Sequence, residues 1–261
     1  CEAMDIPADT TISEAGPGQF EVNLMHQPDA MKAADDAWLF KLLVKGLARE
    51  HGVAASFMAK PYEDYAGNGL HTHFSVIDSD GANIFDERHE GGAELLGHAI
   101  SGCLSAMPGS MLIFAPHASS YDRFVPGAHA PTAASWAHEN RTAALRVPSG
   151  GPAARRIEHR VAGGDINPYL LIAAILGAAL NGLEDHEAPP PPITGNAYAQ
   201  DLPQLPRTWD AAIAAFAEAP EIRRIFTTGL IDNMLAKKRQ ELHYMGELSD
   251  TERRDLYLDT V

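Results

Sequence analysis

The residues best suited to chemistry in this chain are six arginines that fall between positions 120 and 160. Two of them, Arg141 and Arg146, flank the apolar run TAALRV, which is typical of a strand. Arginine binds carboxylates and phosphates through two parallel charge-assisted hydrogen bonds. Because the whole chain has a formal net charge of -15, this local positive charge indicates a site for an anionic substrate or a nucleotide. A ladder of surface salt bridges is the alternative interpretation.

A second short strand is predicted beyond the turn SGGPA, in the segment RRIEHR. Side chains two residues apart on a strand share a face, so Arg156, Glu158 and Arg160 are expected to point together. Ile157 and His159 are expected to point away from them. Glu158 is the one carboxylate between these arginines, and we interpret it as the ligand of a cation.

Two further glutamates, Glu14 and Glu21, bracket the sequence AGPGQF. The glycines and the proline of this sequence are incompatible with a helix, so two strand pieces joined by a bend are predicted. The bend lets both carboxylates converge, and converging carboxylates need a cation or a shared proton. Two solvated glutamates are the alternative.

Two histidines, His71 and His73, lie two residues apart in a predicted strand over 70–77 and therefore share one face. They follow the glycine loop AGNG, which contains Gly67 and allows a close backbone approach to a ligand. An ordinary polar strand face is the alternative interpretation of the two histidines.

The composition excludes several classes of protein. The acidic balance argues against a nucleic-acid partner, which needs a basic surface. The longest apolar run, 170–180, is too short to cross a membrane, so no membrane partner is expected. Cys1 and Cys103 cannot form a disulfide framework, and residues 1–15 lack the apolar core of a signal peptide; we therefore expect a cytoplasmic protein. No Walker loop and no GxGxxG motif occurs.

The elements that must position these residues follow from periodicity and capping signals. Helices are predicted over 29–51, 91–107, 168–183, 209–219 and 221–244, with a closing helix that begins at the capping box of Ser249. A strand is predicted over 53–59 in addition to those above. Trp38 and Cys103 are expected in the core. Lys237, Lys238 and Arg239 are expected on a solvated face.

Five segments in unbroken order resemble the catalytic domain of the glutamine synthetase family over roughly residues 11–184. They are EAGPGQFEVN, KPYEDYAGNGLHTHFSV, SYDRFVPG, NRTAALRVP and RRIEHR, the last followed by NPYLLIAAIL. The resemblance implies an α+β fold, with a curved, mostly antiparallel sheet backed by helices, and a single catalytic domain over 1–261. It also implies ATP-dependent ligation of an amine to glutamate, with Mg²⁺ or Mn²⁺ as the metal.

The same resemblance assigns roles to individual residues. It implies one metal ion on Glu14 and Glu21 and a second on His71 and Glu158. The glutamate-binding residues that it implies are Gly67, Arg123 and Arg160, those facing the nucleotide are His73, Arg141 and Arg146, and the catalytic ones are Arg123, His129 and Arg141.

His129 departs from the family pattern, because glutamine-forming members usually carry a glutamate there. A carboxylate attracts ammonium, whereas imidazole is neutral or positive near neutral pH. His129 can still act as a general base. The departure favours an organic amine, such as a polyamine or monoamine, over ammonia as the acceptor. A His129 loop displaced from the site, with ammonia as the acceptor, is the alternative.

Family members carry an N-terminal β-grasp domain and an acidic strand ahead of this region, and both are expected to be absent from these 261 residues. These residues alone are therefore expected to be inactive, and a homo-oligomeric ring is expected for the full-length protein. Two other functions stay open: a non-catalytic family member that binds glutamate, an amine or a nucleotide for regulation, and a guanidino-phosphotransferase.

Overall fold

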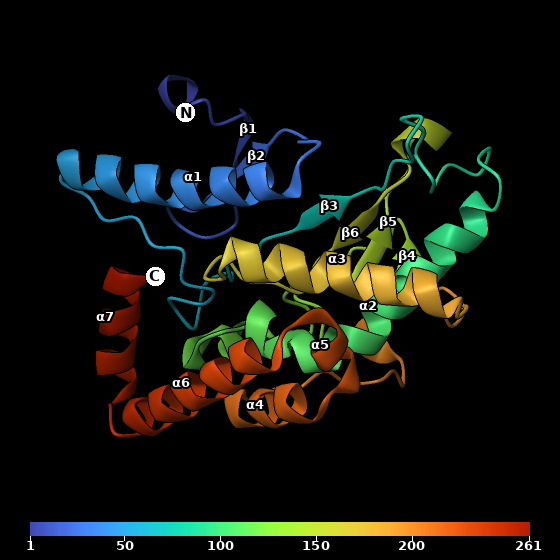
Figure 1. Cartoon of the computed structure of the whole chain (residues 1–261). Coiled ribbons are helices and arrows are strands. Elements are labelled where there is room, and N and C mark those ends of the chain that lie inside the picture. The colour runs from blue at the N-terminus through green and yellow to red at the C-terminus, as the bar shows by residue number, and fades with distance from the viewer.

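Helices and sheets are mixed along the whole chain, as the computed structural model of residues 1–261 shows (Figure 1). The α-helices are α1 Ala30–Glu50, α2 Gly92–Phe114, α3 Pro168–Asp185, α4 Trp209–Glu218, α5 Pro220–Ile225, α6 Thr228–Gly246 and α7 Asp250–Thr260. The strands are β1 Ala8–Ser13, β2 Phe20–Leu24, β3 Thr72–Phe74, β4 Trp136–His138, β5 Leu145–Val147 and β6 Ile157–His159. The predicted α+β class is confirmed.

The strands form two sheets rather than one. β1 and β2 make an antiparallel hairpin, and the other strands make a sheet of order β3-β6-β5-β4 in which only β4 and β5 run parallel. Glu158 of β6 lies opposite His73 of β3 on one side and opposite Arg146 of β5 on the other. The pairing therefore gathers the charged residues on one face of the four-stranded sheet.

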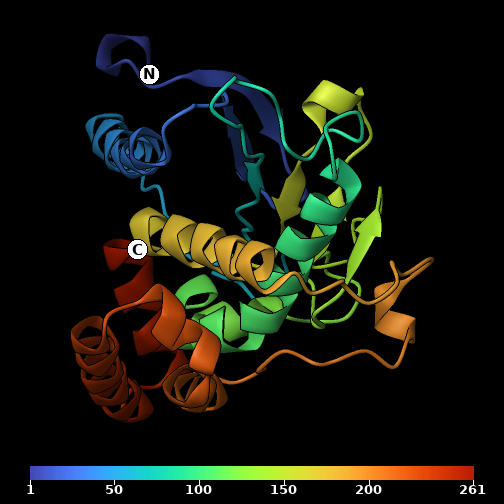
Figure 2. The same cartoon turned by 45° about the vertical axis from the view of Figure 1, so that its right-hand side comes forward.

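The opposite face of this sheet packs on the hydrophobic core. Phe74, Leu145 and Ile157 are buried there, and the ring of His159 lies 4.6 Å from that of Phe114. α2 and α3 lie between the sheet and the C-terminal helices α4 to α6 (Figures 1 and 2). The expectation that Ile157 and His159 point away from the charged face is confirmed.

The capping signals in the sequence were mostly correct. Asp29 caps α1 by accepting from the backbone of Met31, and Asn167 caps α3. Ser249 forms the predicted capping box at the start of α7. Gly52, just past the end of α1, has the left-handed φ of 72° that glycine adopts at helix ends.

Three predictions of secondary structure were wrong. Residues 53–59 form no strand, because their backbone bonds elsewhere: Phe57 donates to Val261 and Ala59 accepts from Asn68. α2 continues to Phe114 through Pro108, since the apolar residues beyond the proline are buried in the core. The predicted helix over 221–244 is divided in two, because the side chain of Thr227 caps a new helix.

Two predictions of burial were also wrong. Trp38 is 48% exposed, whereas the residues of α1 that are buried are Ala34 and Asp36. The contacts of α1 with α3 therefore do not cover the Trp38 side chain. Lys238 is buried, since its ammonium bonds to Glu241 at 2.6 Å and lies over the ring of Trp209.

Two observations concern the predominantly apolar helix α2. Its Cys103 is buried as expected, and burial raises the pKa of the thiol to about 12. By length and composition α2 is also apolar enough to cross a membrane, but 78% of that window is buried inside the fold, and core helices pass the same test.

The closest helix contact, between α2 and α3, generates a prediction about stability. A Cβ atom on Gly182 would lie 2.1 Å from the carbonyl oxygen of His98, so the two backbones meet where no side chain fits. We expect Gly182→Ala to lower the free energy of unfolding by about 1–3 kcal/mol, the usual effect of overpacking.

The matched control is Gly46→Ala on exposed α1, where an added Cβ meets no atom within 4 Å. It should raise the free energy of unfolding by about 0.5–1 kcal/mol, because alanine is the better helix former. Urea unfolding of both variants measures the difference. Equal stability of the two variants would contradict the proposed backbone contact.

Candidate functional site

A buried carboxylate, Glu158, lies at the centre of the charged face of the four-stranded sheet. Its side chain is only 3% exposed. Arg160 Nη1 donates a hydrogen bond to its Oε1 at 2.6 Å, and Arg146 Nε lies 3.1 Å from its Oε2. Two guanidinium groups therefore compensate one buried charge, which would be strongly unfavourable alone.

His71 and His73, which follow the glycine loop, also lie near the carboxylate of Glu158. His71 Nδ1 lies 3.4 Å and His73 Nε2 3.7 Å from Glu158 Oε1. Arg156 donates to His73 Nδ1 at 3.1 Å, so the predicted sharing of one face is confirmed. Burial and then the Arg160 charge lower the pKa of His71 to about 3, and burial also lowers that of His73. Both rings are therefore in the neutral form that binds metals.

The hairpin β1–β2 brings two further carboxylates together, those of Glu14 and Glu21. Glu14 follows β1, and its N–H donates to Gln19 at 2.9 Å across the turn, while Glu21 lies on β2. Partial burial and the charge of Glu14 raise the pKa of Glu21; Glu158 raises it further and Arg141 lowers it. The predicted convergence of Glu14 and Glu21 is confirmed, and the pair lies within electrostatic reach of Glu158.

Gln19 connects the hairpin to the glycine loop, and sequence reasoning missed it. Its Nε2 donates to the carbonyl of Gly67 at 3.0 Å, and its Oε1 accepts from Gly16 at 3.0 Å. A polar residue between two glutamates was the only signal for this connection. It holds the turn between Glu14 and Glu21 against the loop that leads to His71.

Gly67 and Gly69 leave space for the buried side chain of Arg123. A Cβ atom on Gly67 would lie 2.8 Å from Arg123 Cγ, and one on Gly69 3.1 Å from Arg123 Nη2. The Arg123 guanidinium donates to the carbonyl oxygens of Val161 at 2.7 Å and Arg160 at 3.3 Å. Burial lowers its pKa to about 10. Arg123 therefore lies beside Arg160. Backbone carbonyls hold the guanidinium of Arg123, whereas the Glu158 carboxylate holds that of Arg160.

The last two predicted residues, Arg141 and His129, are more exposed. Arg141 lies close enough to Glu21 to lower its pKa. His129 adopts a left-handed φ of 57°, and no hydrogen bond joins its side chain to another residue of the chain. The structure thus gathers the predicted arginines, histidines and glutamates around Glu158, and His129 stands apart from that network.

The residues fit a hard divalent cation. Glu158 Oε2 is buried without a hydrogen-bond partner, and burial, followed by the charge of Glu14, raises the pKa of Glu21. Carboxylate oxygens with one imidazole suit Mg²⁺ or Mn²⁺. The chain contains no group of three or more His, Cys, Asp or Glu side chains arranged to hold an ion. The sequence assigns two ligands to each predicted ion, which agrees with this finding.

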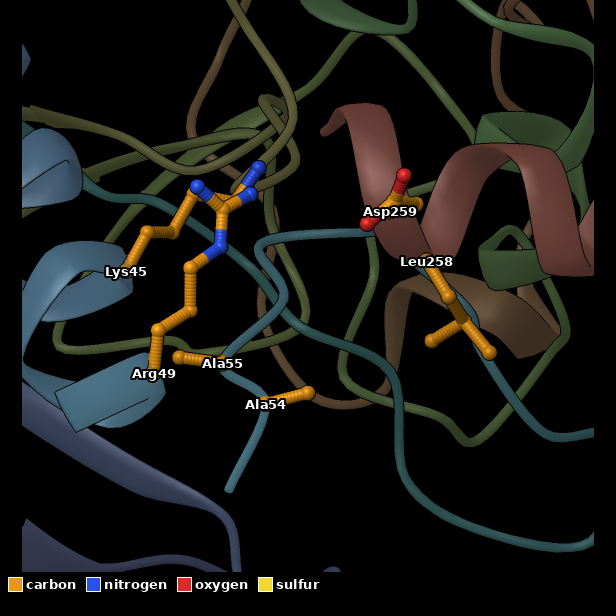
Figure 3. Close-up of a pocket in the computed structure, with 6 residues that line it drawn as sticks. All are labelled: Lys45, Arg49, Ala54, Ala55, Leu258 and Asp259. Atoms are coloured by element: carbon orange, nitrogen blue, oxygen red, sulfur yellow. The ribbon is translucent and has the colours of Figure 1, made fainter. Parts of the chain in front are cut away.

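A small cavity elsewhere is a poor candidate for the site. It has a volume of about 40 Å³ and lies between the end of α1 and α7, where the Lys45 amine and the Arg49 guanidinium lie near Asp259 (Figure 3). This volume holds only a few water molecules. It shares no residue with the cluster around Glu158.

Comparisons with known proteins agree with this geometry. Residues 1–256 match the family described as "Glutamine synthetase, catalytic domain". The sequence is 43% identical to gamma-glutamylputrescine synthetase PuuA of Escherichia coli (strain K12), over 84% of this chain and 46% of that protein. It is 34% identical to a glutamate–isopropylamine ligase of Pseudomonas sp, over 98% of this chain and 57% of that protein. A glutamine synthetase of Thermus thermophilus is 33% identical, over 92% of this chain and 55% of that protein.

A solved structure described as "Apo GmaS without ligand" is similar with a TM-score of 0.84 and 30% identity, and the match covers 97% of this chain and 59% of that one. The chain spans about half the length of the curated relatives it matches. With this match over nearly all of its residues, the chain belongs to the glutamine synthetase family, in the part that forms its catalytic domain.

Proposed function

We propose that this chain is the catalytic part of an ATP-dependent ligase that joins an amine to the γ-carboxylate of glutamate. The observation that carries the proposal is the buried Glu158, shared by Arg146 and Arg160 and approached by two neutral histidines, in a chain of this family. Arginines and carboxylates gathered in this way suit a reaction between anions, in which charge must be neutralised.

Glu14 and Glu21 would hold one divalent ion, and His71 and Glu158 another. Such ions neutralise the charge on the transferred phosphoryl group and orient it. Each ion would take further ligands from outside these residues or from substrates, since Mg²⁺ commonly keeps waters and phosphates in its shell.

The arginines would bind the two anionic substrates. Arg160 uses Nη1 on Glu158, and its other amino group would bind the glutamate carboxylate beside Arg123. His73, Arg141 and Arg146 would face the nucleotide phosphates. The γ-carboxylate oxygen attacks the γ-phosphorus of ATP and releases ADP. The amine nitrogen then attacks the acyl carbon, loses a proton and expels phosphate.

An organic amine is the acceptor that we favour. His129 offers an imidazole where a carboxylate would attract ammonium, and an organic amine gains binding energy from its own carbon chain. Two of the relatives above are named for putrescine and isopropylamine, although a glutamine synthetase matches as well. His129 would serve as the general base for the amine proton.

The assembly and location of the protein are further proposals. We propose a cytoplasmic enzyme that works as a homo-oligomeric ring in its full-length form. The non-catalytic regulatory function gains no support, because the relatives described above are named as synthetases or ligases.

The metal ligands generate one prediction. Glu158→Gln and Glu14→Gln should each weaken Mn²⁺ binding about tenfold or more, because each variant removes a charged ligand but keeps its shape. Isothermal titration calorimetry of the full-length protein measures the affinity directly, whether or not turnover occurs. Glu50→Gln, on the exposed end of α1, is the control. Unchanged affinity in both site variants would overturn the assignment.

The close contact between Gly67 and Arg123 generates a second prediction about this site. Gly67→Ala should raise the KM for glutamate about tenfold, since the new methyl group displaces the Arg123 side chain. Mn²⁺ affinity should stay unchanged, because Arg123 bonds to backbone carbonyls and to none of the four proposed metal ligands. Gly46→Ala again serves as the control. A normal glutamate KM in Gly67→Ala would remove Arg123 from glutamate binding.

The proposed activity itself is tested with a panel of amines on the full-length protein. ADP formation should require glutamate together with an amine, and phosphate should appear in solution rather than on a guanidine. We expect a di-, poly- or monoamine to give a higher kcat/KM than ammonia. His129→Glu should shift the preference toward ammonia. If ammonia surpasses every organic amine with the wild-type protein, the acceptor is ammonia and the specificity proposal fails.

A further inference from the structure

Residues 125–129, which carry His129, form an exposed segment between two buried residues. Phe124 is 3% and Ala130 1% exposed, whereas every residue between them is exposed. Inside the segment the backbone makes one hydrogen bond, from Ala128 to Val125 at 3.1 Å. Within this chain the other bonds that hold the segment are at its two ends, where Val125 also donates to the carbonyl of Arg123 at 2.9 Å.

Side chains from a single connection bind both ends. Arg207 Nη2 donates to the carbonyl of Phe124 at 3.1 Å, and the Tyr198 hydroxyl donates to the carbonyl of Ala130 at 3.0 Å. Both residues belong to the stretch 186–208, which joins α3 to α4. One connection thus fixes the start and the end of the His129 segment.

The connection 186–208 is itself hydrogen-bonded to the two residues that flank Arg141. Asn140 donates to the carbonyl of Gly195 at 2.6 Å, and Ala197 donates to the hydroxyl of Thr142 at 3.0 Å. Tyr198 lies in the short 3₁₀ helix Ala197–Ala199 that begins there. Its position is therefore set by the residues on either side of Arg141.

Tyr198 also faces the arginines proposed to bind glutamate. The charges of Arg123 and Arg160 both act on its hydroxyl, although burial is the larger influence and raises its pKa. Tyr198 is therefore bonded to the end of the His129 segment and lies within electrostatic reach of both arginines. Because His129 is the proposed base for the amine proton, the placement of its segment relative to these arginines bears directly on the acceptor.

We propose that Tyr198, together with Arg207, positions the His129 segment relative to Arg123 and Arg160 and so sets the specificity for the acceptor amine. The inference rests on the proposed ligase function. Tyr198 and Arg207 act as positioning residues, because they bind backbone carbonyls and not the reacting atoms.

The kinetic test uses Tyr198→Phe in the full-length protein, which removes one hydroxyl group. Loss of one such hydrogen bond should raise the KM for the preferred amine about two- to tenfold, while the KM values for glutamate and ATP stay unchanged. Arg207→Met should raise the amine KM to a similar extent, and Arg207→Lys should raise it less. In the double variant Tyr198→Phe/Arg207→Met, the effect on the amine KM should be smaller than two independent effects would give. Tyr244→Phe, at an exposed position on α6, is the control.

A structural test of the same contact does not require enzymatic turnover. Hydrogen exchange in a peptide covering residues 124–131 should be about two- to tenfold faster in Tyr198→Phe than in the wild type or in Tyr244→Phe. Unchanged exchange and an unchanged amine KM would overturn the proposal, as would equal rises in the KM of all three substrates. Faster exchange in a protein that shows no glutamate-dependent turnover would refute the ligase function and leave the positioning contact in place.

Discussion

The burial of one carboxylate, Glu158, is the constraint on which the arrangement of this site depends. An uncompensated buried charge is strongly unfavourable, and breaking a buried pair typically destabilises a protein by about 3–5 kcal/mol. Glu158 therefore requires the guanidinium groups of Arg146 and Arg160 on its two oxygens. Because these residues lie on neighbouring strands, the requirement also fixes the pairing of β5 with β6.

The same electrostatic requirement extends to the elements around the sheet. Arg123 has no carboxylate partner of its own and is held by the carbonyls of Val161 and Arg160, in space left by Gly67. The carbonyl of Gly67 in turn accepts from Gln19, which holds the hairpin turn. The backbone carbonyl of Gly67, and the space that this glycine leaves, thus help to hold Glu14 and Glu21 near Glu158.

Much of this site could be predicted from the sequence because its signals are local. The alternation of Arg156, Glu158 and Arg160 with buried residues, and the bend between Glu14 and Glu21, follow from strand geometry and from glycine and proline. What could not be predicted depends on distant partners. Nothing near Trp38 in the sequence shows that α1 turns that face away from the core.

The long-range contacts of single polar groups were equally invisible in the sequence. Gln19 meets Gly67 across 48 residues, and Tyr198 meets Ala130 across 68. Neither contact produces a periodic pattern, so only the fold identifies them. The same limit applies to Lys238, whose burial depends on Trp209 and Glu241 and not on the charged residues beside it.

The distribution of charge along this acidic chain is compatible with the anionic substrates that we propose. Residues 120–160 contain six arginines and three carboxylates, a formal charge of +3, so the rest of the chain carries −18. The average charge outside this region therefore disfavours anions such as glutamate and nucleotides, whereas the arginines at the sheet favour them. Fields of this kind raise the local concentration of a ligand and fall with ionic strength. The separation of charge along the chain therefore suits the proposed reaction, because the arginine-rich region favours the two anionic substrates and the acidic remainder favours a cationic amine.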